Sequence, residues 1–255
     1  ARLRQGRNDW YNIKNLGNGS AEVVIYDEIG YWGITAQDLI GELKEIDADE
    51  ITLRINSPGG EIFDGIAIYN CLRSHAAKVT THVDSIAASI ASVIAMAGDK
   101  IVMAPHSQLM VHDGSGLCIG NAVDMREMAE MLDRQSNNIA AVYAERAGGT
   151  VADWRERMLA ETWFSADEAV EAGLADEVAK PKRQGDDDPP ADDSWDLSIF
   201  RYSGREVAPA PVAVAAEPAA VDPVAAPEPV EPGNPDPREV ADEWANLTEQ
   251  LTDPA

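Results

Sequence analysis

The sequence has few cysteines, few aromatic residues and no long hydrophobic run. Its 255 residues include 2 cysteines and 4 histidines, and aromatic residues make up 6%. Cys71 and Cys118 lack the spacing of metal ligands, which favours free thiols in a reducing compartment. No apolar run approaches the ~20 residues that cross a bilayer, and no signal-like segment opens the sequence. We therefore expect a soluble, cytoplasmic protein with no metal site, cofactor or membrane partner.

Basic residues are also scarce. The chain has 20 Lys and Arg against 45 Asp and Glu, which gives a formal charge of −25. Both the part up to residue 180 and the part after it carry an acidic excess. Because phosphate backbones repel such a surface, we expect no nucleic-acid partner.

Composition divides the chain into three parts. Residues 1–20 are polar, with Trp10 and Tyr11 among the few apolar anchors, and predict an N-terminal arm that docks onto another surface. Residues 21–180 carry the periodicities of a folded domain. Residues 181–255 are rich in Pro, Ala and acidic residues and cannot bury enough apolar surface to offset chain entropy. This last part is predicted to be a largely disordered tail.

Two segments of the predicted tail have patterns that are typical of secondary structure. Residues 195–202 alternate apolar and polar side chains, the pattern of a docking strand. Asp236, Pro237 and Glu239 are helix-start signals ahead of an apolar stripe, and they predict a short amphipathic helix over 236–251. A lone helix of this length is marginal in water, so it needs a partner.

The central part alternates strand-like and helix-like segments. Small-residue turns separate them, which is the pattern of a parallel sheet with crossover helices in an α/β fold. The segment 121–146 has more apolar residues than a solvated helix needs, so it packs either on another subunit or on its own domain. The predicted strands are 23–26, 51–55, 78–83, 100–103 and 108–112, and the predicted helices are 36–46, 62–72, 90–97, 121–146, 150–159 and 165–172.

Ser89 is the candidate nucleophile. The residues around it read Ile86-Ala-Ala-Ser-Ile90 and link a predicted strand to a predicted buried helix. A hydroxyl at a helix start lies beside unpaired N–H groups and the positive end of the helix dipole, which favours an alkoxide and an adjacent oxyanion. An equally weighted alternative makes Ser89 only a helix N-cap, a role that Ser85 and Ser92 also fit.

Among the four histidines, His112 is the candidate base. It closes a predicted strand at its carboxyl end, the edge where open α/β sheets place their sites. His75 lies near a helix end, His82 in mid-strand and His106 in a turn, where structural roles are favoured. The residues alone leave the orienting acid open among several carboxylates, which include Asp113, Glu161 and Asp167.

Four motifs in order resemble those of the ClpP serine peptidases over roughly residues 21–178. The resemblance implies a ClpP/crotonase-like spiral fold, with stacked parallel strands, crossover helices and a long handle helix. It also implies a homo-oligomeric ring or stacked rings. The motifs are Ile55-Asn-Ser-Pro-Gly-Gly60, Ala87-Ala-Ser89, the strand that ends at His112, and Phe164-Ser-Ala-Asp-Glu-Ala-Val170 with Gly173-Leu-Ala-Asp176.

Further motifs are similar to the ClpP-related head maturation proteases of tailed phages and prophages. This resemblance implies an ATP-independent serine endopeptidase that cleaves capsid or scaffold protein during prohead assembly. The place of action would be the cytoplasm of a bacterial host or the prohead interior. The motifs are Trp10-Tyr-Asn-Ile13, Tyr26-Asp-Glu-Ile-Gly-Tyr-Trp-Gly33, Phe63-Asp-Gly-Ile-Ala-Ile68 and Glu161-Thr-Trp-Phe164.

Carried over by residue, the resemblance makes Ser89 the nucleophile and His112 the general base. The N–H groups of Gly60 and Ile90 would bind the oxyanion. Glu161 falls at the position of the orienting acid, where housekeeping enzymes usually carry Asp.

Three other positions follow from the same comparison. Asp167 is the second candidate for the acid. The backbone at Gly59 would bind a substrate peptide as an added strand. Ser85 stands where the family often has Gly, and is tolerated only with a negative φ.

Two other functions remain open. The first is a housekeeping ClpP-like peptidase that works with an AAA+ unfoldase, although the acidic tail and the Trp10-Tyr11 arm count against it. The second is a crotonase-fold acyl-CoA enzyme or an inactive structural relative, which would use Gly60 and Ile90 without the serine and histidine pair. An acidic surface suits a CoA phosphate poorly.

Overall fold

The structure, a computed structural model, describes three stretches of the chain: residues 11–30, 36–180 and 195–212. All three belong to one contact unit, Ala1–Glu217, whereas the second unit, Pro218–Ala255, lies outside them. The predicted helix over 236–251 is therefore outside the described residues. No described helix is both long enough and apolar enough to cross a membrane.

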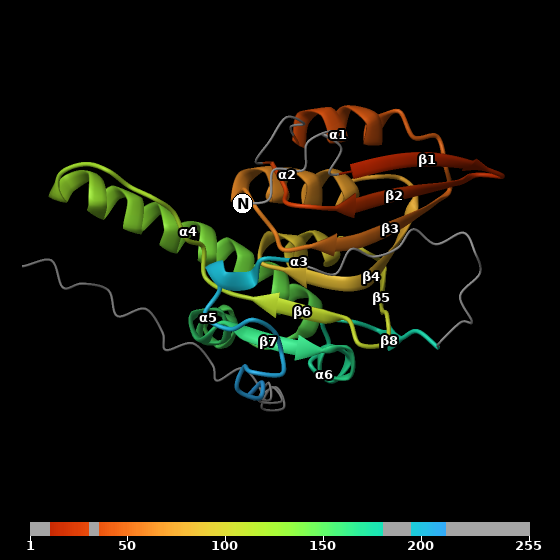
Figure 1. The fold of residues 1–255 in the computed structure, drawn as a ribbon. Coiled ribbons are helices and arrows are strands. Elements are labelled where there is room, and N and C mark those ends of the chain that lie inside the picture. Colours follow the sequence, from red (N-terminus) through yellow and green to blue (C-terminus); the bar gives the residue numbers. More distant parts are fainter. Residues whose placement is uncertain (1–10, 31–35, 181–194, 213–255) are drawn as a thin grey trace, which may run out of the picture. The chain divides into compact units, whose positions relative to one another are not determined.

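A mixed sheet forms the centre of the fold (Figure 1). Its strands are β1 (Tyr11–Gly17), β2 (Ser20–Tyr26), β3 (Glu50–Ser57), β4 (Lys78–Ala88), β5 (Lys100–Met103), β6 (Gln108–Val111), β7 (Thr162–Ser165) and β8 (Glu177–Val178). The order is β1-β2-β3-β4-β5-β8, with β6 paired to β4 and β7 paired to β6. The β1–β2 and β6–β7 pairs are antiparallel and the others parallel. The predicted α/β fold with a mostly parallel sheet is confirmed.

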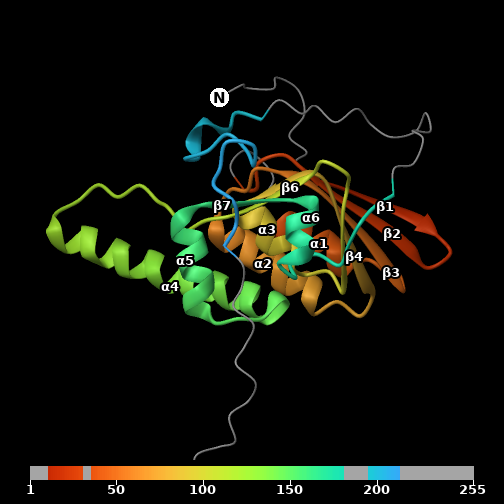
Figure 2. The same ribbon diagram turned by 90° about the horizontal axis from the view of Figure 1, so that it is seen from below.

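Helices cover the sheet and close the core. They are α1 (Ala36–Lys44), α2 (Ile62–Arg73), α3 (Ile90–Ala95), α4 (Ala122–Ala147), α5 (Val151–Ala160) and α6 (Ala166–Glu171). Figure 2 shows α1, α2 and α3 along one face of the sheet. Alternate residues of the strands point into this face, so that Ile25 of β2 and Ile55 of β3 are fully buried with Leu39 of α1. Each of these helices matches a predicted one.

Strand β4 positions the site because it changes partners along its length. Its residues 80–83 pair with β5, and its residues 86–88 pair with β6. The carboxyl end of β4 therefore lies between β6 on one side and Ser57 of β3, which pairs with Ala87, on the other. Ser89 directly follows this carboxyl end, and ligands of open α/β sheets bind outside the carboxyl ends of the strands.

The predicted N-terminal arm is in part a strand of the sheet. Residues 11–17 form β1, and Tyr11 is buried, with its hydroxyl donating to Glu42 Oε1 of α1 at 2.9 Å. The described sheet therefore begins at Tyr11 rather than at Ala21. The prediction missed this strand because only Tyr11 is buried and Ile13 half-buried, so the segment lacks a run of apolar side chains.

Helix α4 is buried along its second half only. Its buried residues there are Ser136, Ile139, Ala140 and Tyr143. The first half extends away from the sheet (Figure 1), and the side chains of Val123 and Met125 are 55% and 45% exposed. The second half thus packs on its own domain, whereas the first half presents apolar side chains at the surface.

Residues 195–212 of the predicted tail are packed on the domain. They contain a short 3-10 helix, Leu197–Ile199, and no strand, so the predicted docking strand is wrong. The segment lies against the sheet through its side chains, because its aromatic residues find apolar partners on β4, β6 and β7. The partners are Ile86, Ala88, Met110 and Trp163, and the segment contributes Trp195, Leu197, Phe200, Tyr202 and Ala208.

Candidate active site

Ser89 lies in the turn between β4 and α3. Its backbone has φ 55° and ψ −130°, a region that non-glycine residues rarely adopt and that costs of order 1–3 kcal/mol. Its hydroxyl makes no hydrogen bond that caps α3. The predicted N-cap role is therefore absent, and the strained turn instead presents the hydroxyl to the end of the sheet.

The register of β4 and β6 brings His112 to Ser89. Ala88 pairs with Met110, and the Ser89 N–H donates to the Met110 carbonyl at 3.0 Å. His112 directly follows β6, so its ring lies beside the turn. Ser89 Oγ and His112 Nε2 are 2.6 Å apart. This is the contact of a hydroxyl nucleophile with its base.

The environment of His112 keeps the imidazole neutral. Burial lowers the pKa of His112 below its usual 6.5, and the nearby charges of Glu161 and Asp113 partly oppose this shift. A neutral imidazole can accept the hydroxyl proton of Ser89, whereas an imidazolium cannot. His112 is thus in the protonation state that a general base requires at neutral pH.

Two backbone N–H groups beside Ser89 have no hydrogen-bond acceptor within the described residues. They belong to Gly60 and to Ile90, the first residue of α3. The loop that carries Gly60 approaches Ser89 closely, since a Cβ built on Gly59 would lie 2.6 Å from Ser89 Cβ and 3.2 Å from Ile90 N. Free N–H donors next to a nucleophile are the elements of an oxyanion hole.

Glu161 is close enough to influence His112 but is bonded elsewhere. It ends α5 with a left-handed backbone, φ 55°, and is 9% exposed. Its Oε1 accepts from the Tyr202 N–H at 2.8 Å and from Trp163 Nε1 at 3.2 Å, and its Oε2 accepts from the Arg201 N–H at 2.8 Å. No hydrogen bond joins it to His112 in the described part of the chain. The structure thus brings Ser89 and His112 into contact and leaves the triad role of Glu161 a prediction.

The other two carboxylates have different surroundings. Asp113 forms a two-pronged ion pair with Arg155, at 3.1 Å and 2.8 Å. Asp167 is exposed in the first turn of α6. Ser85 is absent from the described non-glycine residues with positive φ, as its position requires.

Sequence reasoning missed the hydrogen bonds that hold the turn at Ser89. Ser92 Oγ donates to the Ser89 carbonyl at 2.6 Å and is 2.7 Å from the hydroxyl of Tyr143 on α4. Tyr143 is fully buried, which raises its pKa. This buried chain of polar groups ties the strained turn to α4. The only signal in the sequence was Ser92 itself, one turn after Ser89. Its partner Tyr143 lies 51 residues further along the chain, and the sequence does not show that the two meet.

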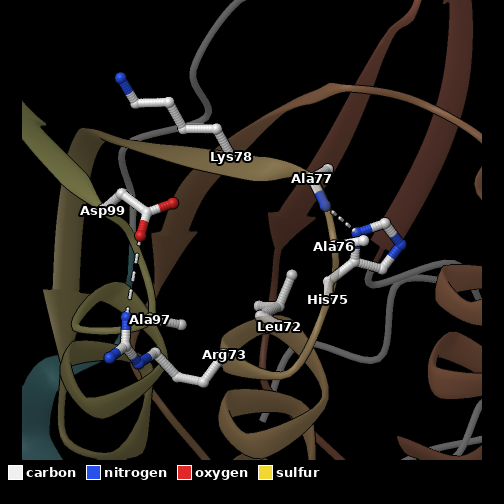
Figure 3. Close-up of a pocket in the computed structure, with 8 residues that line it drawn as sticks. All are labelled: Leu72, Arg73, His75, Ala76, Ala77, Lys78, Ala97 and Asp99. Carbon is white, nitrogen blue, oxygen red and sulfur yellow. Dashed lines mark hydrogen bonds and ion pairs between the residues drawn. The ribbon is translucent and has the colours of Figure 1, made fainter.

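A pocket lies at the opposite end of β4 from Ser89 (Figure 3). Its lining residues are Leu72, Arg73, His75, Ala76, Ala77, Lys78, Ala97 and Asp99. His75 Nδ1 accepts the Ala77 N–H at 3.0 Å, so this histidine stabilises the local turn. The pocket has no hydroxyl or thiol nucleophile in its lining.

Comparison with known proteins identifies the family. The model of the Clp protease family matches residues 5–182. The ATP-dependent Clp protease proteolytic subunit of Deinococcus radiodurans is 30% identical over 190 residues, which cover 68% of this chain and 93% of the relative. The corresponding subunit of Chlorella vulgaris is 36% identical over 150 residues, which cover 56% of this chain and 75% of the relative. The chain therefore belongs to the Clp protease family.

Proposed function

We propose that this chain is a serine endopeptidase in which Ser89 is the nucleophile and His112 the general base. The observation that carries the proposal is the 2.6 Å contact between Ser89 Oγ and His112 Nε2. The strained turn at Ser89 and the free N–H groups of Gly60 and Ile90 support it. A crotonase-fold acyl-CoA enzyme would need the two N–H groups but not the serine and histidine pair.

The reaction follows from this arrangement. Ser89 Oγ attacks the scissile carbonyl carbon while His112 Nε2 takes the hydroxyl proton. The N–H groups of Gly60 and Ile90 stabilise the negative oxygen of the tetrahedral intermediate. The imidazolium then gives its proton to the leaving amine, which produces an acyl-enzyme. Water, deprotonated by His112, hydrolyses this ester and restores the serine.

Labelling with a fluorophosphonate probe tests the assignment. We expect the wild-type chain to be labelled, Ser89→Ala not to be labelled, and His112→Ala to be labelled far more slowly. Ser85→Ala provides a matched control, since it removes a neighbouring hydroxyl that has no place in the reaction. Labelling that persists in Ser89→Ala would refute the nucleophile.

We infer further that the substrate is a capsid or scaffold protein cleaved during phage prohead maturation, in the host cytoplasm or inside the prohead. Three features of the sequence support this role: the Trp10-Tyr-Asn-Ile13 motif, the Glu161-Thr-Trp-Phe164 motif, and an acidic tail beyond the residue 182 at which the family match ends. Co-expression with a candidate capsid protein should yield shortened capsid chains, and Ser89→Ala should leave them intact.

A housekeeping role is the second candidate. The relatives in the comparison are named as proteolytic subunits of ATP-dependent Clp proteases. Capture of an AAA+ unfoldase by the tagged full chain, with ATP-dependent degradation of a folded protein, would favour this role. Cleavage of capsid protein without ATP would favour prohead maturation.

We also propose that the chain works as a homo-oligomeric ring or as stacked rings. The first half of α4 supports this, because it extends from the domain with exposed Val123 and Met125. Analytical ultracentrifugation measures the assembly. Val123→Lys with Met125→Lys should lower its mass.

A further inference from the structure

Residues 195–212 lie beyond the span matched by the family model, which ends at residue 182, yet they contact the active site. The contacts involve the base and the carboxylate next to it. The segment is therefore an addition to the family domain at the place where the chemistry is proposed to occur.

The first contact is with Glu161. Two of the three described donors to its carboxylate are main-chain N–H groups of the segment, from Arg201 and Tyr202, each at 2.8 Å. A buried carboxylate needs such donors, because leaving it unpaired is costly. The segment therefore fixes where this negative charge lies.

One acceptor position of Glu161 remains available. A carboxylate has about four lone-pair sites, and the three described donors use three of them. Among the described residues Oε2 accepts only from Arg201, which leaves it a lone pair for the Nδ1–H of His112. In serine peptidases the orienting carboxylate acts in this way on its histidine.

The second contact is with His112 itself. The Phe200 ring meets the His112 ring edge to face, with centroids 5.5 Å apart and planes at 89°. Phe200 is held in turn by Trp163, at 6.0 Å and 77°. This geometry favours one orientation of the imidazole plane. It also excludes water from one side of the ring.

The segment is anchored on both sides of these contacts. Trp195 Nε1 donates to Asn56 Oδ1 at 3.0 Å. The Arg205 guanidinium binds both carboxylate oxygens of Glu168, at 2.5 Å and 2.6 Å, and this cation lowers the pKa of Glu168 to about 2. The contact of Arg205 is two-pronged and charge-assisted, and it adds to the single hydrogen bond of Trp195 and to the apolar packing of the segment.

We propose that residues 195–212 are a positioning segment of the catalytic site: the N–H groups of Arg201 and Tyr202 hold the Glu161 carboxylate next to His112, and the Phe200 ring fixes the His112 imidazole. This inference rests on the proposed peptidase function. An inhibitory cover is the opposite interpretation. The Ser89 to His112 contact is formed while the segment is docked, which favours positioning.

Substitutions in the full-length chain test this proposal by peptide hydrolysis. Phe200→Ala should lower kcat by up to about tenfold with little change in KM, because an edge-to-face contact is worth at most about a factor of ten. Phe200→Tyr, which keeps the ring, should restore kcat. Tyr202→Pro deletes one N–H donor to Glu161 and should also lower kcat. Ile199→Ala is the matched control, since this neighbouring side chain is 77% exposed.

The pH profile separates positioning from a merely structural role. Phe200→Ala hydrates the imidazole, so the acid limb of kcat/KM should move to higher pH, towards an ordinary histidine. If the alanine variant folds poorly, Phe200→Leu takes its place. This variant fills the same space without a ring and should show the same loss of kcat. An unchanged kcat and acid limb, or a kcat above wild type in Phe200→Ala, would overturn the proposal.

Fluorophosphonate labelling distinguishes this inference from the proposed function. A wild-type chain that is labelled at Ser89, with Phe200→Ala labelled equally fast, would overturn the positioning segment alone. A wild-type chain that resists labelling would overturn both.

Discussion

Replacing Gly59 by alanine should disable the site although the substitution leaves every reacting group in the chain. Gly59 has φ +103°, which side chains rarely tolerate. A Cβ at this position would lie 2.6 Å from Ser89 Cβ and 2.8 Å from the Ala88 carbonyl oxygen. Both neighbours belong to the strained turn, in which the Ser89 carbonyl accepts a hydrogen bond from Ser92 Oγ. The loop must therefore move away from Ser89, and the Gly60 N–H moves with it.

The size of the effect follows from the role of that N–H group. Loss of one oxyanion donor lowers kcat by about 10²–10³ in peptidases. KM should change little, because the donor acts mainly on the transition state. Gly59→Ala should accordingly lower kcat by about a hundredfold or more while the chain remains folded.

Steady-state hydrolysis of a fluorogenic peptide, together with thermal unfolding, measures both effects. Gly148→Ala is the matched control, since Gly148 also has positive φ, +76°, but a Cβ there would meet no atom within 4 Å. The control should lose some stability and keep its kcat. Wild-type kcat in Gly59→Ala would refute the proposed approach of this loop to Ser89.

Three further results are expected. Burial lowers the pKa of His112, so the acid limb of kcat/KM should lie below pH 6.5, and a limb above this value would contradict the environment described. Asp113→Asn removes a negative charge that raises the pKa of His112, so the acid limb of kcat/KM should move to still lower pH. A shift of this limb to higher pH would contradict the described role of Asp113. Tyr143→Phe removes the hydroxyl next to Ser92 and should lower the free energy of unfolding by about 1–2 kcal/mol in denaturant, where an unchanged midpoint would argue against it.

The elements around Ser89 and His112 could be predicted because their signals are local. A β-branched run predicts the strand, the small residues after it predict the turn, and apolar residues at helical spacing predict the buried helix. The contact between the two side chains depends on the register of β4 against β6, which only the folded chain shows. The positive φ of Ser89 likewise has no signal in composition.

The surroundings of Glu161 could not be predicted from residue types. Its partners include main-chain N–H groups about 40 positions later, and every non-proline residue carries such a group. The segment 195–202 has the alternation of a strand, but it packs by side chains on a sheet face instead of pairing at an edge. Strand β7 is four residues long and was missed next to the helix start at Ser165.

Peptide mapping of the fluorophosphonate adduct tests the central claim most directly. The account predicts one covalent adduct per chain, on the hydroxyl of Ser89, formed at a rate that falls as His112 becomes protonated. An adduct on a different serine, or a rate that does not fall as the pH is lowered, would contradict it.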